Sequence, residues 1–405
     1  MELFRIKSRL TKKELLFYTA FGINIFRRLL QVSLINYITP SFLYRGADYL
    51  VLILLLVQWI SYEKFTIKKL LVWGISLSTC LLMFIMHGYL SPLIAISLVL
   101  SAQDIKIERL VKFSSRILLS ITLIVVGSYA LGIVQDYTYV HRVGGELVTA
   151  HSYGFKYYGT IGYIFMTLTA SYLFLHKKSK VIVLIILFFV NYWAYSFHTT
   201  RLAFYGSVAF IIFYILLNRF EVIKLKLKIW KPIAAIFPTL LCFVTYVLVR
   251  LYSQGGRTAL LTVFNTINSR FAYSAEAVRE YGICLMGSKV IMYGNEKLIY
   301  GNATTGFYID SGYIYSLVAY GIIMTVVILI LYTILLRYLV DEKAAFLTIW
   351  TMFLLVCSMM NDFLLSPEYN LVMFLIPQAI ISAYKKRQKH NEVSKVMIRK
   401  SISRV

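Results

Sequence analysis

Residues 252–313 read YSQGGRTALLTVFNTINSRFAYSAEAVREYGICLMGSKVIMYGNEKLIYGNATTGFYIDSGY and form the one long interruption in a series of apolar segments. The runs on either side, 231–251 and 313–336, are long and apolar enough to cross a bilayer. We therefore predict that residues 252–312 form a large extracytoplasmic loop that can fold into a site. The loop gathers ionisable residues beside many aromatics: Arg257, Arg270, Glu276, Arg279 and Asp310.

The composition is that of a multi-pass membrane protein. Of the 405 residues, 59% are hydrophobic and only 15% are charged, and the mean hydropathy is +0.72. A soluble domain is far less apolar than this. The four cysteines stand singly, without the paired spacing of a metal site or a disulfide framework. We assign them no chemistry.

Hydropathy predicts an all-α fold of about 10–12 transmembrane helices, with one long late loop that contains short helices. The first segment carries Arg27 and Arg28 inside it, and the second and fourth are short, so readings with ten or eleven crossings stay open. The twelve candidate segments are 14–37, 47–62, 70–87, 89–102, 113–134, 157–175, 180–197, 202–218, 231–251, 313–336, 344–360 and 368–384.

The placement of lysine and arginine predicts the orientation of the chain. With the N-terminus inside, every predicted cytoplasmic loop is basic, as the insertion rule requires. Most of the net charge of +24 is then explained by membrane insertion, which argues against a nucleic-acid partner. We predict both termini on the cytoplasmic side and four parts: helices over 1–251, the loop 252–312, the last helices over 313–384 and a basic tail over 385–405.

Positive charges on the predicted outer face are not explained by insertion. They face few acids, which suits an anionic substrate presented at the membrane, such as a lipid-linked phosphate or pyrophosphate. Two carboxylates in the last outer loop, Asp362 and Glu368, could help to bind sugar. The outer cations are Arg45, Arg142, Lys156, Arg201, Arg250, Arg257, Arg270, Arg279, Lys289 and Lys297.

Residues 268–282 are predicted to form a short helix capped by Asn268 or Ser269. On helical spacing Arg270 shares a face with aromatic residues, whereas Arg279 points to the opposite side and has Glu276 three residues before it. We therefore favour Arg270 over Arg279 as a substrate ligand.

Two other helix starts carry candidate residues. Arg201 follows His198 where two spans meet, and it is either an interfacial arginine reaching to headgroups or a ligand for a phosphate oxygen. Asp310 precedes Tyr313 at the start of the tenth span, where it is either a helix cap or a general base for a sugar hydroxyl.

The loop 135–156 offers His141 and His151, either of which could act as a base at neutral pH, although histidines in exposed loops usually have no such role. Motifs for a metal-dependent or nucleotide-using mechanism are absent, so we expect no metal and no cofactor. The candidate catalytic residues are Asp310, Arg270 and Arg201, and the candidate substrate-binding residues are Arg257, Arg142, His198, Arg279, Tyr313 and His151.

Three local patterns resemble the O-antigen ligase and Wzy-type polysaccharide polymerase superfamily of bacteria. They are TTRLAF at Thr199–Phe204, NSRFAYSAEAV at Asn268–Val278 and DSGYIYSLVAYGII at Asp310–Ile323, in the family's order and spacing. The motif resemblance covers residues 190–335, and the rest of the chain is similar only in hydropathy. Arg201 and Arg270 fall at the arginines that the family uses to hold pyrophosphate. The ligase branch has a histidine where this chain has Asp310, which favours a polymerase.

The resemblance implies a metal-independent membrane glycosyltransferase of capsule or O-antigen polysaccharide biosynthesis. Its donor and acceptor would be oligosaccharide units on undecaprenyl pyrophosphate at the outer face of the bacterial cytoplasmic membrane. A flippase and a chain-length regulator would be further partners. The alternatives are a flippase or exporter of lipid-linked oligosaccharides, a ligase-type transferase, and a structural or sensory protein with an inert loop. A flippase would be expected to carry its charges inside the spans.

Overall fold

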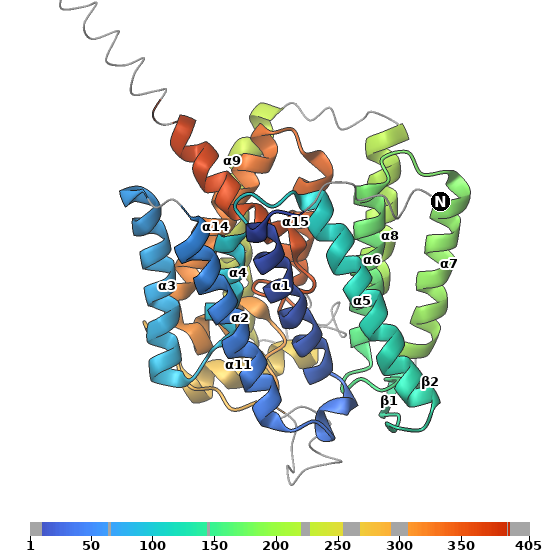
Figure 1. The fold of residues 1–405 in the computed structure, drawn as a ribbon. Coiled ribbons are helices and arrows are strands. Elements are labelled where there is room, and N and C mark those ends of the chain that lie inside the picture. The colour runs from blue at the N-terminus through green and yellow to red at the C-terminus, as the bar shows by residue number, and fades with distance from the viewer. Residues whose placement is uncertain are drawn as a thin grey trace, which may run out of the picture.

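The protein is a bundle of α-helices with a two-stranded hairpin at one end (Figure 1). The computed structural model describes residues 10–63, 66–143, 146–219, 227–253, 268–292, 307–386 and 388. In this part of the chain, six helices are long and apolar enough to cross a membrane, and four apolar helices are shorter. The predicted class, an all-α multi-pass membrane protein, is confirmed.

Each of the twelve predicted segments contains helix. The helices are α1 (Lys12–Gln31), α2 (Ser41–Tyr62), α3 (Ile67–His87), α4 (Ser91–Ser101), α5 (Ile107–Ala130), α6 (Gly159–Leu175), α7 (Val181–His198), α8 (Arg201–Arg219), α9 (Leu227–Ser253), α11 (Asn268–Tyr281), α13 (Gly312–Tyr315), α14 (Gly321–Asp341) and α15 (Ala345–Cys357). Shorter turns are η1 (Leu34–Tyr37), η2 (Ser316–Tyr320) and η3 (Leu371–Leu375), and a last helix covers 376–386.

Helix α1 keeps its two internal arginines because each has an acidic partner. Arg27 Nε lies 2.9 Å from Asp48 Oδ1 on α2, and Arg28 Nε lies 2.8 Å from Glu368 Oε2. A buried ion that loses its partner costs about 3–5 kcal/mol, so these pairs make the charges tolerable within the bundle. At the other end of α1, Thr11 and Glu14 form a capping box.

The core lies around α4 and α14. Every residue of α4 from Ile94 onward is buried, and α14 packs against both α9 and α3. Helices α2 and α3 instead expose many apolar side chains, among them Ile53, Ile60 and Ile85. Apolar side chains that face outward from a helix bundle of this composition are suited to lipid contact.

The predicted span 313–336 is not one continuous helix. It is interrupted by a π-helical turn over Ser316–Tyr320, after which α14 begins at Gly321. The loop segment that follows α11 docks at the break: the Ile322 and Ile323 amides donate to the carbonyls of Cys284 and Leu285 at 3.1 and 3.2 Å. These bonds satisfy helix N-terminal donors that have no partner within their own helix.

The predicted span 368–384 is also only partly helical. Residues 363–370 are mostly buried but contain no regular helix, and the helical part begins at Leu371. Buried irregular backbone is tolerated only where the surrounding protein satisfies its polar groups. Here Tyr332 of α14 donates to the Leu364 carbonyl at 2.6 Å, and Asn370 donates to the Tyr332 hydroxyl at 2.7 Å. We call residues 358–370 the buried loop.

The predicted outer loop 135–156 forms an antiparallel hairpin of β1 (Thr138–Val143) and β2 (Glu146–His151). The predicted short helix over 268–282 is confirmed as α11. Figure 1 shows α11 and the hairpin at one end of the bundle, and the start of α1 and the end of the last helix at the other. Helix α11, which carries Arg270 and Arg279, and the hairpin, which carries His151, therefore share one end.

Candidate functional site

Arg270 is the centre of a group of residues that the described part of the chain brings into electrostatic contact. Its guanidinium donates to the Met360 carbonyl at 2.5 Å and to the hydroxyl of Tyr163. Helix α11 presents Arg270 beside the bundle because the same helix buries Phe271, Ser274 and Ala277. Although burial opposes its charge, the nearby tyrosines and Asp310 hold the pKa of Arg270 above its ordinary value. The guanidinium thus stays cationic.

Three tyrosines from the start of α6 surround this arginine. Tyr157, Tyr158 and Tyr163 all feel the charge of Arg270. The rings of Tyr157 and Tyr158 lie 4.5 Å apart, and Tyr158 stacks on Tyr139 of β1 at 5.7 Å. The result is an arginine bordered by aromatic faces and hydroxyl groups, which are the groups that proteins use against sugars and phosphates.

Asp310 faces Arg270 but does not cap the following helix. The cap of α13 is Ser311, whose side chain accepts from the Ile314 amide at 3.3 Å. Among the described residues no hydrogen bond or salt bridge holds the Asp310 carboxylate, which remains partly accessible. Burial raises the pKa of Asp310, and the charge of Arg270 opposes that rise. The capping interpretation of Asp310 is therefore wrong.

The start of α8 adjoins this group. A Cβ on Gly159 would lie 3.1 Å from the Thr200 hydroxyl, so the turn before Arg201 packs against the beginning of α6. Arg201 is half-buried at the first residue of α8. It therefore lies next to the tyrosine segment.

A second carboxylate approaches the same place from the buried loop. Asp362 Oδ1 lies 3.2 Å from the position that a Cβ on Gly312 would occupy, two residues after Asp310. Its carboxylate accepts from the Leu364 amide and faces Arg28 and Glu368. Burial raises the pKa of Asp362 to about 6; the charge of Arg28 lowers it and that of Glu368 raises it further.

The remaining candidates lie elsewhere or outside the described residues. Arg279 is exposed on the far face of α11, and Tyr313 is fully buried and donates to the Leu355 carbonyl at 3.1 Å. His151 Nδ1 lies 2.5 Å from Asp136 Oδ2, a contact that ties β2 to the start of the hairpin. Arg257 lies outside the described residues, as do the side chains of Arg142 and His198.

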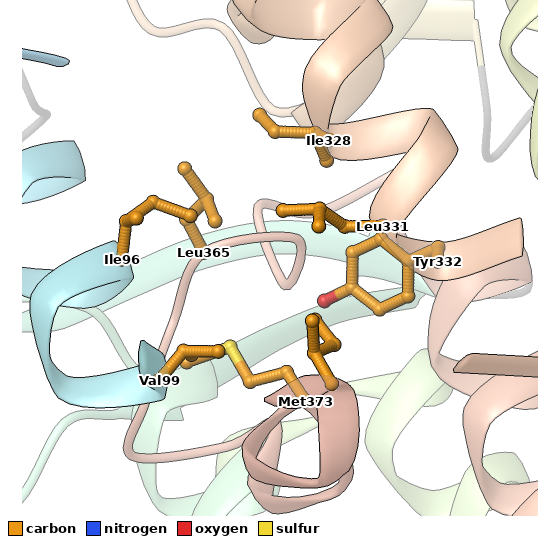
Figure 2. A pocket seen from close by; sticks show the side chains of 8 residues that line it. Ile96, Val99, Ile328, Leu331, Tyr332, Leu365 and Met373 are labelled. Atoms are coloured by element: carbon orange, nitrogen blue, oxygen red, sulfur yellow. The ribbon is translucent and has the colours of Figure 1, made fainter. Parts of the chain in front are cut away.

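Two cavities in the described part of the chain are lined by residues outside the Arg270 group. Figure 2 shows an apolar cavity of about 10 Å³ between α4, α14 and the segment 365–376, lined by Ile96, Val99, Ile328, Leu331, Tyr332, Leu365, Met373 and Ile376. This is at the lower limit for one water molecule, and the Tyr332 hydroxyl is already engaged. An open hollow of about 400 Å³ lies beside Tyr338 and Lys385. Neither contains the charge pattern described above.

Sequence reasoning missed three tyrosines as partners of Arg270. Tyr157, Tyr158 and Tyr163 were part of a predicted span, where aromatic residues are common. A group of three or more metal-ligating side chains is not found among the described residues.

No protein-family model, no curated protein and no solved structure matches this chain. What the fold itself defines is a multi-pass helical membrane protein with a polar, aromatic group at one end of the bundle.

Proposed function

We propose that this protein is a membrane glycosyltransferase that joins lipid-linked oligosaccharide units into a polysaccharide at the outer face of the bacterial cytoplasmic membrane. The observation that carries the proposal is the meeting of Arg270 with Asp310, Tyr157, Tyr158 and Tyr163 at one end of the bundle. A permanent cation among hydroxyls and a free carboxylate suits a substrate that carries both diphosphate and sugar.

In the proposed reaction, an acceptor hydroxyl attacks the anomeric carbon of the donor while the undecaprenyl diphosphate leaves. Arg270 binds the diphosphate oxygens and stabilises the charge that develops on them, an effect for which one donor typically contributes about 10²–10³-fold in rate. The tyrosines stack against and hydrogen-bond the sugars. Asp310 balances the charge of Arg270 and accepts hydrogen bonds from sugar hydroxyls.

The test is chain growth in cells and with purified protein. Arg270→Ala should abolish polymer while leaving lipid-linked single units and protein level intact, and Arg270→Lys should restore little because lysine lacks the planar fork. Arg45→Ala, an exposed outer arginine on α2, is the control. Unchanged polymer length in Arg270→Ala would remove this proposal.

A flippase of lipid-linked oligosaccharides is the second candidate, and one observation favours it. The pairs Arg27–Asp48 and Arg28–Glu368 place charges inside the bundle, next to an irregular buried loop. Transporters build substrate sites from interrupted helices of this kind. Purified protein in detergent distinguishes the two: a transferase lengthens glycans without a bilayer, whereas a flippase moves labelled lipid-linked sugar only in vesicles.

A further inference from the structure

The buried loop contacts Arg270 near its start and Arg28 near its end. Near its start, the Met360 carbonyl accepts from Arg270 at 2.5 Å. Near its end, Glu368 pairs with Arg28 of α1 at 2.8 Å. Asp362 lies between these two contacts. Its position is therefore set both by the arginine of the site and by the first helix.

The surroundings of Asp362 leave one cation to balance two acids. The groups that face or act on it are Arg28 from α1, Glu368 from its own loop, and the hydroxyls of Tyr315, Tyr320 and Tyr332 from α13, the π-helical turn and α14. Glu368 forms the direct ion pair with Arg28. Asp362 is therefore the carboxylate of the two that binds a proton more readily. It is surrounded by protein and yet keeps part of its surface accessible.

We propose that Asp362 is a further catalytic residue, the group that takes the proton of the acceptor hydroxyl, and that the Arg28–Glu368 pair positions it. This inference rests on the proposed transferase. The acceptor O–H bond breaks and its electron pair forms the new bond to the anomeric carbon. The anomeric C–O bond to the diphosphate breaks with its electrons on the leaving oxygen, next to Arg270. The proton stays on Asp362 until water removes it.

Asp362 fits this role better than Asp310 on two grounds. Burial raises the pKa of Asp310 as well, but Asp310 faces Arg270 directly, and this contact makes it the counter-charge to the diphosphate ligand. Asp362 has its pKa raised by burial to about 6, close to the operating pH, where a general base is most effective. The small Gly312 lets Asp362 reach the start of α13 beside Asp310.

The first measurement is the pH dependence of polymerisation by purified protein with lipid-linked units as substrate. Wild-type activity should fall as the pH drops through about 6, because the base becomes protonated. Asp362→Asn should lower the rate by about 10²–10⁴-fold and remove this acidic limb. If the limb disappears in Asp310→Asn and persists in Asp362→Asn, the base is Asp310 and the inference is wrong.

The second measurement breaks the positioning pair from either side. Arg28→Gln removes a cation near Asp362 and should move the acidic limb to higher pH, by about one unit or more. Glu368→Gln removes a neighbouring anion and should move it to lower pH. Arg27→Gln is the matched control, because Arg27 pairs with Asp48 on α2 instead.

A purely structural pair would behave differently, since both Arg28→Gln and Glu368→Gln break the same contact. Equal losses of rate with an unmoved limb in both variants would overturn the inference. Polymer made by Asp362→Asn at the wild-type rate and with the wild-type pH profile would also overturn it while leaving the transferase in place. Absence of polymer with wild-type protein would remove the transferase proposal itself.

Discussion

Two adjacent residues, Asp310 and Ser311, have different roles at the start of α13. The sequence left open whether Asp310 caps this helix or acts in catalysis. In the structure the cap is Ser311. This division matters because the two residues are adjacent and a substitution at either could disturb the same turn. It also allows the two roles to be measured separately.

Asp310→Asn and Ser311→Ala should change different properties of the protein: the first turnover and the second stability. Ser311→Ala should lower the melting temperature in detergent, because a lost cap costs about 1 kcal/mol. Asp310→Asn should leave the melting temperature unchanged and lower turnover about tenfold or more, because a counter-charge to Arg270 is removed. Wild-type turnover in Asp310→Asn would contradict the ligand-facing role of this carboxylate.

At the scale of elements, the interruption between α13 and α14 is what attaches the long loop to the bundle. Ser288 donates to the Val318 carbonyl at 2.9 Å, and the Val290 amide donates to the Tyr89 hydroxyl at 2.7 Å. Gly287 and Gly321 both adopt positive φ, +75° and +81°, where the two backbones touch. A side chain at either position would separate the segments.

Gly287→Ala should destabilise this junction. Its Cβ would lie 2.2 Å from the Ala319 carbonyl oxygen, and the positive φ adds strain of about 1–3 kcal/mol. We expect a lower melting temperature in detergent and faster proteolysis of the loop. Gly74→Ala on α3, where a Cβ meets nothing within 4 Å, is the control. Equal stability of the two variants would show that the docked segment does not hold the loop.

At the scale of the whole molecule, the arrangement places α11 and the hairpin together and the start of α1 and the end of the last helix together (Figure 1). The side that faces the cytoplasm follows from the lysine and arginine distribution alone, and it therefore needs its own measurement.

The natural cysteines provide this measurement. Cys284 is exposed in the segment after α11, whereas Cys80, Cys242 and Cys357 are buried. A membrane-impermeant maleimide should label intact cells from which any outer barrier has been removed, and Cys284→Ser should abolish the labelling. Labelling only of inside-out vesicles would place the loop in the cytoplasm and end the proposal of an outer-face transferase.

The sequence by itself determined the helical membrane class, the position of nearly every helix and which arginine of α11, Arg270 or Arg279, lies on the side toward the bundle. These are properties of short segments: hydropathy sums over about 20 residues, and helical spacing decides which of two arginines on α11 lies on the buried side. The tertiary structure alone decided the rest. Arg270 meets Met360 across 90 residues, and Arg28 meets Glu368 from the opposite end of the chain. The helix breaks at 316–320 and 358–370 are likewise held by partners distant in the sequence. A broken span and an unbroken span have the same apolar composition, so hydropathy does not predict these breaks.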